Sequence, residues 1–218
     1  MPQARSEATR HKILDAATNL FSEVGYAAAG LGEVIERVGM TKGALYHHFD
    51  SKEALATAII ELGSNQTSDA FRRVCDSSSP ALESMIHGVF VVAERLTSDK
   101  TARTAEQLAR GLADFNSAAS HAWSSLLAAM TIQARRASSE DDLREGVDPQ
   151  VVSEAILNTM LGAHLLSKTA ADPSHHIERL TRSLELLLPA IVADASLPYF
   201  CEFLARENLR RTTDNQLS

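Results

Sequence analysis

The sequence predicts an all-α protein, with a three-helix N-terminal unit followed by a longer helical region. Apolar residues make up 44% of the 218 residues but aromatic residues only 5%, and residue types that favour strands are therefore scarce. Ten glycines and six prolines leave little chain for long loops. Apolar side chains also recur at helical spacing over most of the chain, which is typical of amphipathic helices.

The first two helices are predicted from short apolar stripes that each end at a glycine. The first stripe consists of Ile13, Ala17, Leu20, Phe21 and Val24. Gly25 follows it as the expected C-terminal stop. The second stripe consists of Leu31, Val34, Ile35 and Val38, and Gly39 ends it. Both spacings place the apolar side chains on one face of a helix.

Two hydroxyl residues predict the starts of the next two helices. Thr41 can cap a third helix over residues 42–48, and Ser51 can cap a fourth with Glu53 in its first turn. The buried face of the fourth helix is predicted to be Leu55, Ala58, Ile59 and Leu62. The second and third helices form a helix-turn-helix arrangement. No Pro/Gly linker follows residue 62, so we expect the fourth helix to continue as a rod that can transmit movement.

The rest of the chain predicts further helices over residues 80–97, 100–113, 118–139, 149–168, 174–194 and 196–210. The stripe of residues 174–194 is Ile177, Leu180, Leu184, Leu187, Leu188, Ile191 and Val192. Residues 149–168 are apolar on one face at Val152, Ala155, Ile156, Met160 and Ala163, and on another at Leu157, Leu161 and Leu165. A helix that is apolar on two faces is buried on both. We therefore expect these last two helices to pair the chain with a second copy of itself.

Composition limits the functional classes. The N-terminus lacks the apolar segment of a secretory signal, and the longest apolar run, residues 186–193, is too short to span a membrane. Cys75 and Cys201 are isolated, which argues against a disulfide framework and favours a reducing cytoplasm. The net charge is −7. However, residues 1–12 contain three basic residues, Arg5, Arg10 and Lys12, and only one acidic residue. A basic arm is therefore predicted before the first helix.

The segment "MTKGALYHHFDSKEAL", residues 40–55, has the composition of a recognition helix that enters the major groove by its N-terminal end. Gly43 and Ala44 are small enough for the backbone to approach DNA, and Lys42 can reach a base edge or a phosphate. Other polar groups suit the flanking phosphates, namely Thr41, Tyr46, His47 and Lys52. Leu45 and Phe49 are predicted to face inward and hold the helix in place.

Residues 10–62 resemble the DNA-binding domain of the tetracycline-repressor (TetR) family. The matching positions are Phe21, Gly25, Tyr26, Ile35, Gly39, Lys42, Gly43, Leu45, Tyr46, Phe49, Lys52 and Glu53. The resemblance implies an all-helical homodimer with N-terminal DNA-reading heads and a C-terminal ligand-binding and dimerisation domain. One departure is that Ala29 and Gly30 stand where the family often has Thr followed by Ser or Thr. Gly30 can still cap the second helix next to the DNA through its backbone.

The C-terminal half is similar to the gamma-butyrolactone receptor branch of that family. The shared features are "TARTAEQLA", the single Trp123, "GVDPQVVSEAILNTMLGAHLL" and an additional final helix. In that branch a tryptophan packs against the lactone signal, which implies that Trp123 lines the pocket. The predicted apolar walls are Met85, Phe90, Leu108, Leu112, Phe115, Leu127 and Met130. Gln107 is the polar group that is expected to bind a ligand carbonyl or hydroxyl.

No cofactor, metal site or catalytic motif is predicted. Adjacent histidines on a helix point in different directions, so the pair at 175 and 176 does not form a metal site, and His164 has no partner at ligand spacing. No Ser–His–Asp or phosphate-loop motif is present either, so the chain is not expected to be an enzyme.

The sequence therefore predicts a ligand-responsive transcriptional repressor that binds a palindromic DNA operator as a homodimer. Residues 1–54 would be the DNA-binding domain and residues 55–218 the ligand-binding and dimerisation domain. A small apolar molecule, such as a gamma-butyrolactone-type signal, would release the DNA. One alternative is a TetR-type regulator of efflux or catabolism that senses a drug, lipid or acyl-CoA. Another is a small-molecule-binding protein or enzyme without DNA specificity.

Overall fold

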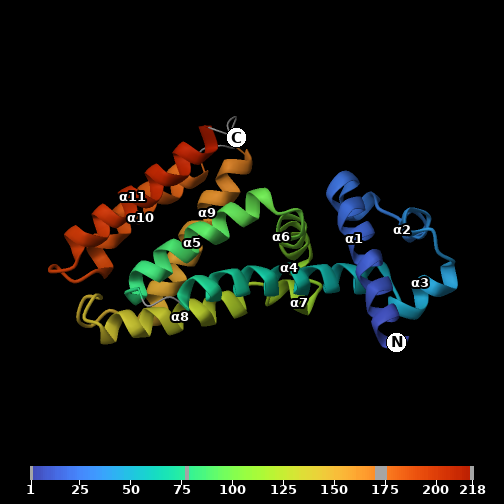
Figure 1. The fold of residues 1–218 in the computed structure, drawn as a ribbon, viewed down its shortest axis with the longest axis horizontal. Helices are drawn as coiled ribbons and strands as arrows, with labels where there is room; N and C mark the ends of the chain where they lie inside the picture. Colours follow the sequence, from blue (N-terminus) through green and yellow to red (C-terminus); the bar gives the residue numbers. More distant parts are fainter. Residues whose placement is uncertain (1, 77–78, 170–175, 217–218) are drawn as a thin grey trace. The chain divides into compact units, whose positions relative to one another are not determined.

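A computed structural model describes residues 2–76, 79–169 and 176–216, and its regular elements are helices (Figure 1). Their bounds are α1 Pro2–Ala28, α2 Leu31–Val38, α3 Lys42–His48, α4 Lys52–Cys75, α5 Ala81–Ser98, α6 Lys100–Leu112, α7 Ser117–Ser120, α8 Ser124–Ser139, α9 Pro149–Thr169, α10 His176–Ile191 and α11 Leu197–Gln216. Strand-like pairing within these described ranges is limited to an isolated bridge between Leu143 and Val192. The predicted all-α class is confirmed.

The chain contacts divide it into two compact units. Unit 1 consists of Met1–Gln66 and Leu96–Trp123, and unit 2 of Thr67–Arg95 and Ser124–Ser218. Unit 1 therefore includes α6 and α7 as well as the helix-turn-helix. The functional division expected at residue 54 stays a prediction.

The core of unit 1 is built from the predicted stripes. Ile13, Ala17, Leu20 and Phe21 of α1 are buried together with Val34 of α2. The cluster continues into α4 through Leu55, Ala56 and Ile59, and into α6 through Ala105, Leu108 and Ala109. Burial of this apolar surface holds α2 against α1 and α3 against α2, and Figure 1 shows these three helices as neighbours at the N-terminal end of the chain.

Glycines interrupt α1 and end α2 at the positions where the sequence predicts helix stops. The backbone of α1 breaks at Gly25, whose φ of 81° is in the left-handed region that favours glycine. Gly39 ends α2 with φ 69° and ψ 39°, and its N–H donates to the carbonyl oxygens of Ile35 and Glu36. These stops set the turns that precede α2 and α3.

Three predicted details of the helices are wrong. Val24 is 47% exposed, because the core contacts of the α1 stripe end at Phe21. The helix predicted over residues 118–139 is divided into α7 and α8, because His121–Trp123 form a turn. The basic N-terminal segment is not an arm before the first helix, since α1 already begins at Pro2.

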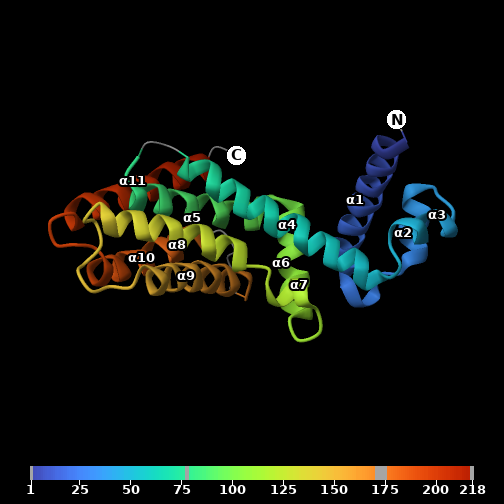
Figure 2. The ribbon, with the colours of Figure 1, turned by 90° about the horizontal axis from the view of Figure 1, so that it is seen from below.

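Unit 2 is a helical bundle in which α8 packs on α9, α9 on α10, and α10 on α11 (Figure 2). The predicted α10 stripe is confirmed, since Ile177, Leu180, Leu184 and Leu188 are all buried. Residues 174 and 175 of that predicted helix lie outside the described residues. In the part of the chain that the structure describes, no helix is long and apolar enough to cross a membrane.

Gly63 of α4 marks a close approach between α4 and α6 within unit 1. A Cβ at residue 63 would lie 2.3 Å from the Cβ of Ala105 and 3.1 Å from the carbonyl oxygen of Thr101. We predict that Gly63→Ala lowers the free energy of unfolding by about 1–3 kcal/mol, because overpacking outweighs the gain in helix propensity. Urea denaturation followed by circular dichroism measures this change.

Gly111→Ala in α6 is the matched control, because no atom lies within 4 Å of a Cβ built there. This variant should be more stable than the parent by about 0.5–1 kcal/mol, the usual difference between alanine and glycine in a helix. Equal unfolding midpoints for the two variants would contradict the tight α4–α6 contact.

Candidate nucleic-acid interface and cavities

Helix α3 and its N-cap residue Thr41 present an exposed face. Thr41, Lys42, Gly43, Ala44, Tyr46 and His47 are all exposed. Lys42 Nζ lies 5.7 Å from the centre of the Tyr46 ring, which keeps the amine and the phenol on the same side of the helix. This surface combines small residues with hydrogen-bond donors, so a duplex could approach the backbone while the polar groups contact phosphates and base edges.

Two inward-facing side chains hold α3 on unit 1. Leu45 and Phe49 are buried, which confirms that they face inward. At the start of the helix, the Thr41 hydroxyl accepts a hydrogen bond from the Ala44 N–H at 3.3 Å. In the turn after α3, Ser51 accepts a similar bond from Ala54 N–H at 3.0 Å. The exposed polar face is therefore fixed by a buried apolar face and by both predicted caps.

The structure gives Lys52 a role within the protein. Its Nζ donates to the carbonyl oxygen of Ala29 at 2.8 Å and to that of Ala27 at 3.2 Å. The same amine lies 4.5 Å from the centre of the Tyr26 ring. Lys52 therefore ties the start of α4 to the end of α1, and we call this set of contacts the Lys52 latch. The contact of Lys52 with a DNA phosphate stays a prediction. The contact of Gly30, the N-cap of α2, with DNA also stays a prediction.

Basic side chains of α1 add positive charge to the same unit. Arg5, Arg10 and Lys12 are exposed on α1. The Arg10 guanidinium stacks 5.0 Å from the centre of the Phe49 ring, which places one of these charges next to the C-terminal end of α3. An acidic protein can thus present a local cationic surface to a phosphate backbone.

The predicted ligand-binding residues are distributed over both units. Gln107, Leu108, Leu112, Phe115 and Trp123 belong to unit 1, and Met85, Phe90, Leu127 and Met130 to unit 2. Met85, Phe90 and Met130 are fully buried core residues, whereas Phe115 is 83% exposed. Trp123 is half-buried against the core of unit 1. Their common role as a pocket lining stays a prediction.

One cavity in unit 1 is lined in part by three of the predicted ligand-binding residues, Gln107, Leu108 and Leu112. It has a volume of about 310 Å³ and is lined by Phe21, Gly25, Tyr26, Ala27, Thr104, Gln107, Leu108, Gly111 and Leu112. We call it the α1–α6 cavity, because α1 and α6 supply all of these residues. Burial, and secondarily the Glu53 carboxylate, raises the pKa of Tyr26 and so favours its neutral phenol, which can donate a hydrogen bond.

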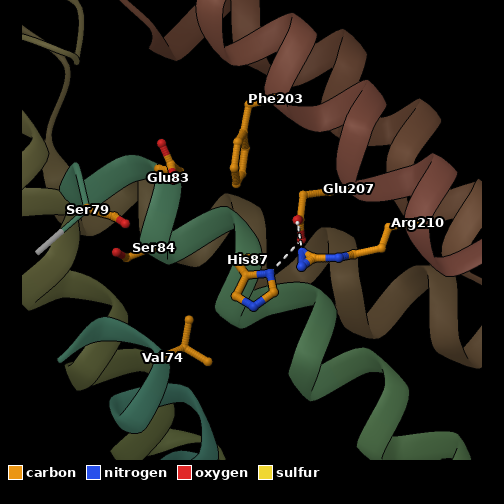
Figure 3. Close-up of a pocket in the computed structure, with 8 residues that line it drawn as sticks. All are labelled: Val74, Ser79, Glu83, Ser84, His87, Phe203, Glu207 and Arg210. Atoms are coloured by element: carbon orange, nitrogen blue, oxygen red, sulfur yellow. Dashed lines mark hydrogen bonds and ion pairs between the residues drawn. The ribbon is translucent and has the colours of Figure 1, made fainter. Parts of the chain in front are cut away.

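A second cavity, of about 320 Å³, lies in unit 2 among α4, α5 and α11 (Figure 3). Its walls include Val74, Glu83, Phe203 and Arg210, with His87 and Glu207 at one end. This polar lining differs from the apolar pocket that the sequence predicts.

Beside this second cavity lies an ion-pair cluster that the sequence analysis missed. Glu207 Oε2 lies 2.5 Å from His87 Nδ1 and 2.5 Å from Arg211 Nη1, and Arg211 Nε lies 2.7 Å from Glu94 Oε1. Burial would raise the pKa of Glu207, but the His87 hydrogen bond and the Arg211 charge outweigh it and lower the pKa to about 2. No local motif joins residues 87 and 207, so only the tertiary fold reveals the cluster.

In the described ranges, no group of three or more His, Cys, Asp or Glu side chains could hold a metal ion. His175 lies outside those ranges. Cys75 is buried, which raises the pKa of its thiol to about 11, and it is not in a disulfide.

Comparisons with known proteins agree with the geometry of unit 1. Residues 13–59 match the family model described as "Bacterial regulatory proteins, tetR family". The A-factor receptor protein of Streptomyces griseus is 28% identical over 189 residues, which cover 87% of this chain and 66% of that relative. This chain thus spans slightly less than two thirds of that protein.

Solved structures extend the likeness to most of the chain. A structure described as the molecular basis for control of antibiotic production by a bacterial hormone has a TM-score of 0.76 and 28% identity, covering 85% of this chain and 98% of its own. A gamma-butyrolactone receptor described as ArpA-like has a TM-score of 0.73 and 23% identity, covering 94% of this chain and 99% of its own. This second likeness concerns the fold.

Proposed function

We propose, from the TetR-family DNA-binding domain in residues 13–59, that this protein is a cytoplasmic, ligand-responsive transcriptional repressor that binds a palindromic operator as a homodimer. The observation that carries the proposal is the α3 surface. Its polar residues between Thr41 and His47 are exposed, while Leu45 and Phe49 on the opposite face are buried in the core of unit 1. That arrangement suits the insertion of a helix N-terminus into the major groove.

Exposed apolar side chains on unit 2 support the homodimer. On α9, Leu165 and Leu166 are exposed although Ile156 and Met160 are buried, and on α10 Leu186 is 84% exposed. Large exposed leucines on neighbouring helices favour a protein interface. We expect two copies to pair through α9 and α10, and a dimer that reads a palindromic operator needs its two α3 helices about 34–36 Å apart, the separation of successive major grooves on one face of a duplex.

A small molecule would regulate this binding through its preference for one conformation. It can weaken DNA binding only to the extent that it binds the non-binding conformation more tightly. The similarity to the A-factor receptor protein, together with the sequence resemblance to the gamma-butyrolactone receptor branch, supports a lactone-type effector. The proposed protein is a regulator and not an enzyme.

The experiment that tests the proposal is a mobility shift with the purified protein and the DNA upstream of its own gene. The expected result is a specific shift that a gamma-butyrolactone relieves. A shift that does not respond to lactones or butenolides would retain the regulator and exclude this effector class. The absence of a specific shift, on this DNA and on sequences selected from a random library, would reject the proposal.

Trp123 provides a separate prediction for the effector. Because Trp123 is the single tryptophan and is half-buried, its fluorescence should change when the effector binds to unit 1. Trp123→Ala should bind the operator as tightly as the parent but require at least a tenfold higher effector concentration for release. A dose–response series in the mobility shift measures this change, and an unchanged response would place the effector away from Trp123.

A further inference from the structure

We infer that the α1–α6 cavity binds a compact, neutral, apolar molecule with one carbonyl oxygen, and that its occupancy acts on the Lys52 latch. This inference rests on the proposed regulator function, because it assigns a second point of small-molecule control to the DNA-reading unit itself. The cavity residues come only from α1 and α6, both within unit 1.

The buried hydroxyl of Thr104 indicates a ligand. Thr104 is 1% exposed, its Oγ1 has no hydrogen-bond partner in the structure, and it lines the cavity. A buried hydroxyl without a partner is destabilising, and most such groups in proteins are hydrogen-bonded. A carbonyl oxygen held in the cavity would accept a hydrogen bond from Thr104 and satisfy this group.

The other walls determine the class of molecule. None of the described lining residues is charged, and Phe21, Leu108 and Leu112 supply apolar contacts. Because desolvated charge needs a charged or hydrogen-bonded partner, a carboxylate or an ammonium group is disfavoured there. The volume of about 310 Å³ is at the lower end of the range for small-molecule sites, so the ligand is small.

The cavity also touches the segment that the Lys52 latch holds. Gly25, Tyr26 and Ala27 line the cavity, and Gly25 is the break in α1. The Ala27 carbonyl accepts from Lys52, whose amine also lies on the Tyr26 ring. Lys52 follows Phe49, the buried anchor of α3, by three residues. A molecule that displaces Tyr26 or Ala27 therefore acts on the contacts that position the recognition helix.

Titration calorimetry with the full chain and 2-octanone tests the site without DNA. We expect the parent protein to bind 2-octanone saturably. It should not bind octanoate, which has the same number of carbon atoms but carries a negative charge. Thr104→Val should weaken 2-octanone binding about tenfold without lowering the unfolding midpoint, because only an unpaired hydroxyl is lost. Gly111→Leu should abolish binding, since Gly111 lines the cavity, a Cβ built there has no atom within 4 Å, and the larger leucine side chain would occupy the space of the ligand.

Thr131→Val in α8 is the control, because that hydroxyl already donates to the Leu127 carbonyl oxygen at 2.9 Å in unit 2. It should bind 2-octanone as the parent does. No binding by the parent, or equal binding by the parent, Thr104→Val and Gly111→Leu, would overturn the inferred site.

The mobility shift separates this inference from the proposed function. Gly111→Leu should shift the operator as the parent does, but 2-octanone should release only the parent. Calorimetric binding that leaves the parent's shift unchanged would overturn the action on the latch. If the parent gives no specific shift in the absence of 2-octanone, the regulator is rejected, while the calorimetric result still decides whether the site exists.

Discussion

Lys42→Ala is expected to lower the affinity for the operator at least tenfold while leaving the helix content and the dimer unchanged. Lys42 is the first residue of α3, and its side chain is exposed. An amine at the N-terminal end of a recognition helix can contact a guanine edge, and loss of such a contact costs about 1–3 kcal/mol. Because its contact within the protein is the exposed Tyr46 ring, the fold should not depend on it.

Fluorescence anisotropy with a labelled operator, repeated over a series of salt concentrations, measures this effect. A base contact would relax specificity at one position, whereas a phosphate contact would reduce the salt slope by about one. Lys100→Ala is the matched control, since Lys100 lies on α6 of the same unit and donates to Asn19. Tyr46→Phe should weaken binding less than Lys42→Ala does. Unchanged affinity in Lys42→Ala would exclude Lys42 from the interface.

Glu207→Ala is expected to lower the free energy of unfolding by about 3–5 kcal/mol. Glu207 is buried and neutralises Arg211, which is also buried. Removal of the carboxylate leaves Glu94 as the acidic partner of the Arg211 guanidinium among the described residues, and it leaves His87 Nδ1 without this acceptor. Breaking a buried ion pair by deleting one member is strongly destabilising, because the remaining charge stays desolvated. Thermal or urea unfolding measures the loss.

Glu202→Ala is the matched control on the same helix. Glu202 and Arg206 form an exposed pair on α11, and such pairs contribute little to stability. Its unfolding free energy should stay within about 0.5 kcal/mol of the parent. An equal loss in the two variants would contradict a special role for the buried cluster.

The pH dependence of stability follows from the lowered pKa of Glu207. Its pKa is about 2 in the folded protein against an ordinary value of 4.5. The unfolded chain therefore takes up the proton first as the pH falls, and the contribution of Glu207 is complete above about pH 4.5 and lost towards pH 2. The stability difference between the parent and Glu207→Gln should accordingly shrink over this range, in urea titrations at each pH.

Much of unit 1 could be predicted from sequence because its signals are local. Gly39, Thr41 and Ser51 act on residues within one turn, and the spacing of Leu45 and Phe49 fixes the inner face of α3. The exposed α3 residues follow directly from that spacing. The break at Gly25 could be located in the same way, although the helix before it extends much further towards the N-terminus than its apolar stripe indicates.

Features that depend on distant parts of the chain could not be predicted. The position of Lys52 at a helix N-terminus suggests that its amine contacts a phosphate. In the structure, however, the amine donates to carbonyl oxygens more than twenty residues earlier in the chain. The cavity at Thr104 needs α1 and α6 to meet, and the Glu207 cluster needs α5 and α11. The sequence does not indicate that either pair of helices packs together, since side chains of the same types are ordinary surface or core residues elsewhere in the chain.

The spacing of the two half-sites gives the most direct test of dimeric, sequence-specific DNA reading. The measurement is the affinity for an operator selected from a random library, compared with the same operator carrying five extra base pairs between its half-sites. We predict tight, specific binding to the first and at least a tenfold loss on the second, because an extra half-turn rotates one half-site away from its α3 helix. Equal affinity for both duplexes and for unrelated DNA would contradict the account.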